Sequence, residues 1–409
     1  MIYGMTKKKN ALPVLFSMVI LDQMASWMLL PILPLLFIEP GSYFFLLKNP
    51  EQIQSVGYIL LSLLFAVFPF VQFFAGPILG EFSDKYGRKP ILIFAAACIA
   101  LGYTLFVSGV ILQSIPILFV ARILSGFGGG SLGVIFASAA DISTQSERAK
   151  NFGIVAAASG LGLILGPLLG GVLSDNSIVS NFNLLTPLYA VIIMALCNLL
   201  VVSFYFSETI NAPDRTRSVR WGKSLLYIRE AYESNSLRGI FLVSFLFSVC
   251  LALFVSFGPV LIYGRFGISE SSLSYFLGYF GFWIIVTQLG LVSAVLRMAH
   301  EVVVLRNSLS GIFVGLLIFY FAPTWLWLLL ATPVIALGVA LSYTMITSLL
   351  SMRTDATTQG KILGINTSVQ SLAFALPGVF SGLIAAKISI DAPILTAAVF
   401  VLLAAVFVF

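Results

Sequence analysis

The sequence predicts an all-α membrane protein with twelve transmembrane helices in two pseudo-symmetric six-helix bundles. Composition is the first reason. Of the 409 residues, 59% are hydrophobic and only 9% are charged, and the mean hydropathy is +1.06, whereas soluble domains are nearer to half apolar and about a quarter charged. The second reason is that the apolar residues form long runs, and an α-helix needs about 20 such residues to cross a bilayer.

The predicted spans fall into two groups of six. The first group lies near residues 12–38, 55–79, 91–112, 115–138, 151–173 and 185–206. The second group lies near residues 239–263, 270–295, 302–321, 324–349, 362–386 and 391–409. The longest polar stretch separates the groups. We therefore predict an N-terminal six-helix bundle (1–206), a cytoplasmic linker with a surface helix (207–238) and a C-terminal six-helix bundle (239–409).

Internal similarity suggests that the two groups are distant repeats. Residues 141–153 lead into the fifth span and residues 355–364 lead into the eleventh, and the two stretches share an Asp-x-Ser/Thr-Thr-Gln start. Further along, Gly166-Pro167 has its counterpart in Pro377-Gly378. Parallel six-helix halves of this kind occur in membrane transport proteins.

The basic residues predict the orientation. Of the 22 Lys and Arg residues, all but Lys48, Arg122, Arg265 and Lys387 fall on the side of the amino terminus. The positive-inside rule makes that side cytoplasmic, and an even number of spans places both termini there. The net charge of +6 thus reflects topology, and we expect no nucleic-acid partner.

Cysteine and histidine usage argues against an enzyme. Cys98, Cys197 and Cys250 lie in apolar spans without a shared spacing, and His300 is the only histidine. This pattern predicts neither a disulfide framework nor a metal site. Without a nucleophile–base pair, a metal cluster or a phosphate-binding loop, we expect no catalytic residues, no metal and no cofactor.

The densest charged stretch joins the second and third spans. Residues 80–90 carry five charged side chains and two glycines between long apolar runs. This turn resembles the pattern G-x-x-x-D-K/R-x-G-R-K/R that the major facilitator superfamily carries between its second and third helices. The resemblance implies a cytoplasmic gate and charge relay, in which Arg88 pairs with two carboxylates and Asp84 approaches a helix start near Lys361. The implied gate residues are Gly80, Asp84, Gly87, Arg88 and Asp141.

Asp22 is the candidate proton-binding residue. It stands about ten residues into the first span, roughly 15 Å deep at 1.5 Å per residue. A charge there is costly, and such residues usually face the bundle interior or an ion pathway. The surrounding sequence resembles the first helix of tetracycline/proton antiporters, which implies proton coupling. Arg122 in the fourth span is the expected partner, through a contact or a water bridge, because an intramembrane arginine needs an anion or water. The alternative is a structural pair that only joins helices.

The fifth span carries a glycine pattern, G-x8-G-x3-G-P-x2-G-G, which resembles the motif of the antiporter branch of the superfamily. Small residues recurring every four positions let helix backbones approach closely. The alternative interpretation is tight packing without functional meaning. The residues of this antiporter motif are Gly153, Gly162, Gly166, Pro167, Gly170 and Gly171.

The resemblance also implies a substrate cavity between the halves, lined by the first, fourth, seventh and tenth helices with help from their neighbours. The candidate residues are Gln23, Ser26, Trp27, Gln72, Ser125, Gln288, Tyr343, Thr344, Asn366 and Gln370, with Phe254, Tyr279 and Phe280 as further aromatic candidates.

The function implied is secondary active transport: proton-coupled antiport that exports a small organic molecule, a drug or a metabolite, by alternating access. We expect a monomeric multi-pass protein of the bacterial inner membrane, whose partners are the substrate, protons and the lipid bilayer. The third span lacks the acidic residue that tetracycline exporters carry there, which argues against tetracycline itself. One alternative is a proton-driven importer of a siderophore or sugar, and another is a lipid flippase or a receptor that transports nothing.

Overall fold

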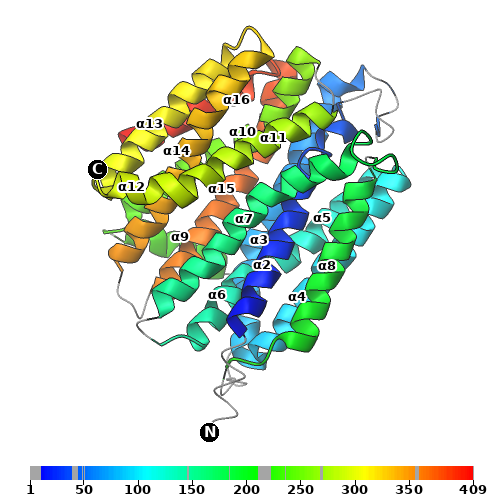
Figure 1. Cartoon of the computed structure of the whole chain (residues 1–409). Coiled ribbons are helices and arrows are strands. Elements are labelled where there is room, and N and C mark those ends of the chain that lie inside the picture. The colour runs from blue at the N-terminus through cyan, green and yellow to red at the C-terminus, as the bar shows by residue number, and fades with distance from the viewer. Residues whose placement is uncertain are drawn as a thin grey trace.

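The computed structural model describes residues 11–38, 45–47, 49, 51–144, 147–183, 185–210, 223–234, 236–267, 270–354 and 359–408. Within these ranges the regular structure is helical throughout (Figure 1). Ten of the described helices are long and apolar enough to cross a membrane, and two shorter apolar helices, Tyr275–Val286 and Ala392–Val406, complete the twelve. The predicted fold class is confirmed.

The spans follow the predicted order. The six spans of the first half are α2 (Ala11–Met28), α3 (Tyr58–Tyr86), α4 (Arg88–Ile111), α5 with α6 (Ile115–Gly129 and Leu132–Asp141), α7 (Arg148–Ser174) and α8 (Thr186–Tyr205). Those of the second half are α10 (Arg238–Phe266), α11 with α12 (Glu270–Val286 and Val292–Leu296), α13 (Glu301–Tyr320), α14 (Trp325–Met352), α15 (Gln359–Lys387) and α16 (Ala392–Val406). Helix α9 (Lys223–Glu233) lies within the predicted linker, of which residues 211–222 and 235 are outside the described ranges.

The first span ends earlier than predicted. We expected helix to residue 38, but α2 stops at Met28, and turns and a short 3₁₀ segment at Pro34–Leu36 follow. Pro31 and Pro34 explain the difference, because proline lacks the amide hydrogen that continues a helix and disfavours helical geometry in the residue before it.

The charged stretch between the second and third spans is more helical than predicted. Helix α3 runs to Tyr86 and α4 starts at Arg88, so Gly87 alone separates them. Its φ of +103° lies in the left-handed region that favours glycine. Pro90 is therefore the third residue of α4, where a missing amide hydrogen still costs no internal hydrogen bond.

The fourth span is broken in the middle. Gly130 and Ser131 separate α5 from α6, directly after two further glycines. The break frees backbone carbonyls, and the Gln72 side chain donates a hydrogen bond to the carbonyl oxygen of Gly129 at 3.1 Å. Such partners stabilise an interrupted helix inside a membrane.

The eighth span is also irregular. A π-helical turn, Thr287–Leu291, lies between α11 and α12. Turns of this kind often occur at functional sites. The turn carries Gln288, whose side-chain nitrogen donates to the hydroxyl oxygen of Thr344 on α14 at 3.2 Å.

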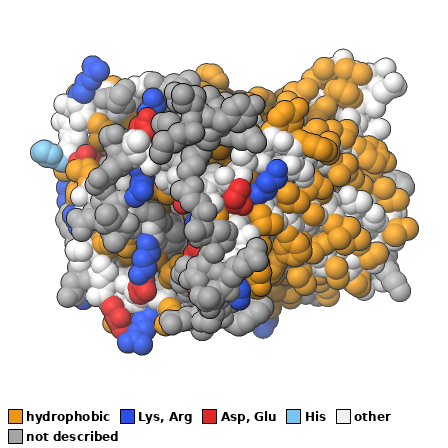
Figure 2. Space-filling view, turned by 90° about the horizontal axis from the view of Figure 1, so that it is seen from below, with side chains coloured by type: hydrophobic (Ala, Val, Ile, Leu, Met, Phe, Trp, Pro, Cys, Tyr) orange, Lys and Arg blue, Asp and Glu red, His pale blue; other side chains and the backbone are white. Residues whose placement is uncertain are grey.

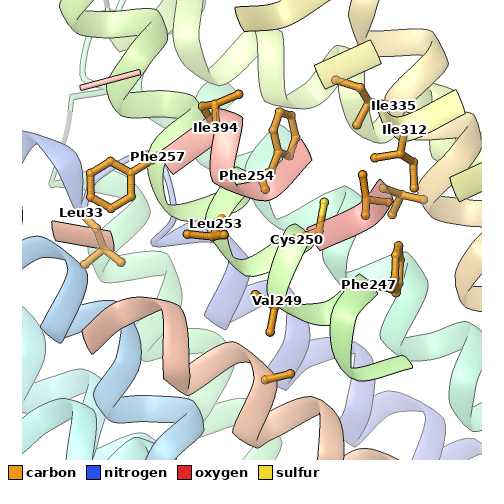
Figure 3. Close-up of a cluster of buried hydrophobic side chains, with 14 of the residues drawn as sticks. Leu33, Phe247, Val249, Cys250, Leu253, Phe254, Phe257, Ile312, Ile335 and Ile394 are labelled. Carbon is orange, nitrogen blue, oxygen red and sulfur yellow. The ribbon is translucent and has the colours of Figure 1, made fainter. Parts of the chain in front are cut away.

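Helix α10 forms the centre of the second half. Phe247 and Cys250 lie on the side of α10 that faces Ile312 of α13 and Ile335 of α14, and Phe257 lies near Leu33 of the first half (Figure 3). Most of α10 is buried, which fits a helix that contacts neighbours on all sides.

The halves are closely packed on the side away from Ala11, which we call the far side. On α15, a Cβ atom added at Gly378 or Gly382 would overlap backbone or side-chain atoms of α3, among them Ser62. On α11, the same addition at Gly281 would lie 3.0 Å from the side chain of Ile164 on α7. These glycines let backbones of opposite halves approach.

On the Ala11 side, the α7–α11 interface opens. Gly160, Ala157 and Gly153 continue the α7 face that carries Ile164, yet a Cβ added at Gly153 or Gly160 meets no atom within 4 Å, and Ala157 is exposed. Gly290 after α11 likewise has no neighbour within that distance. The two helices therefore touch on the far side and separate toward the Ala11 side.

The surface has the character of a bilayer protein. Large apolar side chains such as Phe204 and Leu330 are strongly exposed, and Figure 2 shows a broad hydrophobic area next to a region where charged side chains gather. An apolar surface of this extent is expected to be covered by lipid.

Candidate functional site

Asp22 lies well inside α2 and is partly buried. In the described part of the chain its carboxyl group has no hydrogen-bond or ion-pair partner. A carboxylate inside a membrane needs a partner, a proton or water. Asp22 is therefore free to exchange a proton if water reaches it.

In the described part of the chain, Arg122 on α5 makes no direct contact with Asp22, and the water bridge that we gave as the other possibility stays a prediction. Its side chain is 7% exposed, its Nε donates to the carbonyl oxygen of Leu64 at 3.3 Å, and its guanidinium carbon lies 5.3 Å from the centre of the Phe68 ring. The α3 backbone and an aromatic face thus hold the cation in place.

Tyr103 of α4 lies against the helix that carries Asp22. Its side chain is 1% exposed, and its hydroxyl is 2.6 Å from Ser26 Oγ on α2. The hydroxyl is within electrostatic reach of both Asp22 and Arg122. Our sequence analysis assigned Tyr103 no role, although a tyrosine in the middle of a span must find a partner for its hydroxyl.

The glycines of the fifth span pack against the helix that carries Asp22. A Cβ atom added at Gly166 would lie 2.7 Å from the Met24 carbonyl oxygen and 2.8 Å from Trp27 Cβ. Gly162 faces Gln23 and Met24 even more closely, and Gly170 faces Met28. The predicted close approach is thus present between α7 and α2.

The other motif residues have different surroundings. Pro167 lines a cavity, and Gly171 is buried, with its carbonyl oxygen accepting a hydrogen bond from Ser174 Oγ at 3.0 Å. Gly153, near the start of α7, has no neighbour within 4 Å of an added Cβ.

A narrow apolar cavity lies between the halves, with walls from α2, α7, α10, α11 and α13. Trp27, Phe254 and Phe280 line it, and the Phe254 and Phe280 rings lie 5.7 Å apart. The polar residues that the sequence analysis named as cavity candidates, such as Gln23 and Gln370, are not among the described residues that line this cavity.

Two of those polar residues are buried between helices. Ser125 is 1% exposed and donates to the Ala121 carbonyl oxygen of its own helix. Asn366 is 4% exposed and accepts a hydrogen bond from Ser244 at 2.7 Å. Neither residue lines the apolar cavity described above, since a polar group inside a bundle is satisfied most readily by a neighbouring helix. Their role in the substrate site stays a prediction.

The remaining cavity candidates have separate surroundings. Gln23 accepts a hydrogen bond from the Trp27 indole at 3.1 Å. Tyr343 is 43% exposed, Gln370 is partly buried, and Tyr279 donates to the Leu329 carbonyl oxygen at 3.3 Å.

The charge cluster on the Ala11 side centres on Arg88, which is 6% exposed. Its Nη1 lies 2.6 Å from Asp84 Oδ1 and its Nε lies 3.0 Å from Asp141 Oδ2. Both ion pairs expected from the sequence are present, and both lie within the first half. Lys361, at the start of α15, pairs with Glu230 of α9 at 2.8 Å.

Glu208 completes the cluster, and sequence reasoning placed it only in the linker. Its carboxylate accepts hydrogen bonds from the backbone amides of Arg88 at 2.9 Å and Lys89 at 3.0 Å. A negative charge at a helix start is favourable. A Cβ atom at Gly87 would lie 2.6 Å from Glu208 Oε2, so Gly87 is required both for its φ and for this approach. Its neighbour Thr209 donates to Asp141 at 3.1 Å.

Replacing Arg88 with alanine is expected to destabilise the protein by about 3 kcal/mol, because two carboxylates would lose the guanidinium between them. The change should lower the midpoint of thermal unfolding in detergent. Arg229→Ala is the matched control. Its ion pair with Glu233 has the same i,i+4 spacing as the Asp84–Arg88 pair but is exposed, and exposed pairs contribute little to stability. Equal shifts in the two variants would contradict a structural role for the buried cluster.

The helical fold, the interrupted spans and the intramembrane charged residues together define a multi-pass membrane transporter. More specifically, the chain belongs to the Major Facilitator Superfamily, whose family model matches residues 15–376.

Tetracycline resistance proteins are among its relatives. The chain is 24% identical to the class C protein of Escherichia coli over 375 residues, which cover 90% of this chain and 87% of that protein. It is 35% identical to the class G protein of Vibrio anguillarum over 157 residues, 38% of this chain and 36% of that protein. The predicted resemblance to the drug/proton antiporter branch is thereby confirmed.

Solved transporters share the fold. The human organic anion transporter MFSD10 (TETRAN) superposes with a TM-score of 0.72 at 19% identity, covering 98% of this chain and 99% of that one. The D-xylose–proton symporter gives a TM-score of 0.71 at 16% identity, covering 98% and 97%. At such identities the likeness extends to the fold alone.

Proposed function

We propose that the protein is a proton-coupled antiporter that exports a small organic molecule across a bacterial inner membrane. The observation that carries the proposal is Asp22, a carboxyl group inside the first span that has no partner in the described part of the chain. The tetracycline resistance relatives support export. In this proposal the Ala11 side and both termini are cytoplasmic, as the positive-inside rule predicts, and the protein works as a monomer.

In this proposal the two halves move relative to each other, so that the cavity between them opens alternately to the two sides of the membrane. Opening of α7 from α11 on the Ala11 side is the inward-facing state. The substrate enters between the halves toward Trp27 and the Phe254–Phe280 pair. Proton binding at Asp22 drives the return, and the gate and antiporter-motif residues guide the movement of α3 and α7.

The test is transport by purified protein in liposomes that contain a pH-sensitive dye, with tetracycline as the first probe and a panel of lipophilic and metabolite probes after it. Antiport predicts that one of these probes moves across the membrane in the direction opposite to protons that flow down an imposed pH gradient. Movement of a probe together with protons would identify an importer instead, and no proton movement with any transported probe would refute coupling.

Asp175 forms a link between the halves on the far side. Its carboxylate accepts hydrogen bonds from the Ser177 backbone amide at 2.8 Å and from the Tyr275 hydroxyl of α11. Bonds from Ser177 and then Tyr275 hold the pKa of Asp175 below its usual range. Because the folded pKa is depressed, this link stabilises the closed far side above the ordinary pKa and is lost only as the pH falls through the lower folded value. It stays intact at neutral pH, so it is not the source of proton coupling.

Replacing Tyr275 with phenylalanine is expected to shift molecules toward an open far side several-fold, since a hydrogen bond to a charged carboxylate between the halves is lost. The measurement is labelling of a cysteine introduced at Ser62, which is buried where α3 meets α15, in a variant without native cysteines. Tyr279→Phe is the control because it removes a hydroxyl bond within the second half. Equal labelling of all variants would exclude the link as a gate.

A further inference from the structure

Tyr103 has a buried hydroxyl group to which the proposed mechanism assigns no role. It is 1% exposed in the middle of α4, and its hydroxyl is 2.6 Å from Ser26 Oγ. Packing fixes this position: Gly102, the preceding residue, lies against Ser125 and Ala121 of α5, with an added Cβ 2.8 Å from the Ser125 amide nitrogen. Any movement of the α4 backbone away from α5 would break the contact between Gly102 and Ser125.

Ser26 places the Tyr103 hydroxyl on the face of α2 that carries Asp22. Residues four apart on a helix lie one above the other on one face, so Ser26 and Asp22 are neighbours along α2. The Tyr103 hydroxyl is within electrostatic reach of both Asp22 and Arg122. In the described part of the chain, Asp22 and Arg122 are the charged groups that act on the Tyr103 hydroxyl.

Arg122 is held away from Asp22 by its own contacts with Leu64 and Phe68. It therefore does not neutralise the Asp22 carboxylate by direct contact. A second group has to stabilise that carboxylate when its proton leaves, because an isolated charge inside a membrane is costly. The Tyr103 hydroxyl, which lies beside Ser26 one turn along α2 from Asp22, can donate such a hydrogen bond.

We propose that Tyr103 is a positioning residue for proton exchange, whose hydroxyl pairs with Ser26 while Asp22 is protonated and turns to donate to the Asp22 carboxylate once the proton has left. This inference rests on the proposed function. Tyrosine keeps its own proton throughout, so the Asp22 proton is the only one that moves. Arg122 supplies positive potential at the Tyr103 hydroxyl.

The two partners of the hydroxyl give predictions of opposite sign. In Tyr103→Phe the ionised Asp22 loses its donor, and the midpoint of its titration should rise by about one pH unit. In Ser26→Ala the tyrosine loses its competing partner and is free to donate to Asp22, so the midpoint should fall. A merely structural role for Tyr103 would not move the two midpoints in opposite directions.

The experiment needs no substrate. The full-length protein is titrated in detergent, and the infrared carbonyl band of the protonated Asp22 is obtained as the difference between wild type and Asp22→Asn. Tyr189→Phe is the control, because Tyr189 is 48% exposed on α8. Opposite shifts with an unchanged control support the proposal.

Unchanged midpoints in Tyr103→Phe and Ser26→Ala, or shifts in the same direction, would overturn it while leaving Asp22 as the proton site. If Tyr103→Phe does not fold, the downward shift in Ser26→Ala still decides. If no Asp22 band titrates in the wild type, Asp22 is not the proton site, and both the proposed function and this inference are refuted.

Discussion

Asp22→Asn is expected to reduce proton-coupled transport to the level of protein-free vesicles. Asparagine has nearly the shape of aspartate but cannot take up or release a proton at neutral pH. Because Asp22 has no partner in the described chain, its replacement breaks no hydrogen bond. The folded protein should therefore be no less stable, since the cost of a charge inside the membrane is also removed.

The measurement separates coupling from substrate movement. Proton flux with a transported probe should vanish, whereas exchange of labelled for unlabelled probe across the same vesicles should persist, because exchange requires no net proton step. Asp22→Glu keeps a titratable group and should retain part of the coupled flux. Full coupling in Asp22→Asn would show that protons use another route.

Gly166→Ala is expected to have the second largest effect. The new methyl group would lie 2.7 Å from the Met24 carbonyl oxygen, a backbone atom that cannot move aside alone. Overpacking of this kind costs about 1 to 3 kcal/mol. Helix α2 would be displaced from α7, and the surroundings of Asp22 would change with it, so both stability and transport should fall.

Gly160→Ala is the matched control on the same helix. Its added Cβ meets no atom within 4 Å, and alanine is a better helix former than glycine by about 1 kcal/mol. The midpoint temperature of thermal unfolding should therefore fall in Gly166→Ala and stay the same or rise in Gly160→Ala. Similar losses in both variants would mean that the glycines act through helix flexibility and that contact with α2 is unimportant.

Much of the fold was predictable because membrane spans are a local property. Length and hydropathy located every span, and the charged turn after Gly80 identified the superfamily. The misplaced boundaries lie where local cues compete: Pro31 and Pro34 end the first helix early, and Gly130 interrupts the fourth span inside an apolar run. Hydropathy is insensitive to both, because it does not register backbone geometry.

The candidate site was predictable only in part. Asp22, Arg88 and the Gly166 region are conspicuous because charge and small residues are unusual in their spans. Tyr103 and Glu208 are ordinary in sequence, and their importance comes from partners 77 and 120 positions away along the chain.

The amino-acid sequence alone determined the number and order of the spans, the superfamily and the residues that are costly to place in a bilayer. Each of these depends on the free energy of transferring a short segment from water into lipid. Only the tertiary structure decided that Arg122 binds the α3 backbone, that Glu208 caps α4 and that the halves close on the far side. Those outcomes depend on how distant helices pack, and packing is a property of pairs of surfaces that no single segment contains.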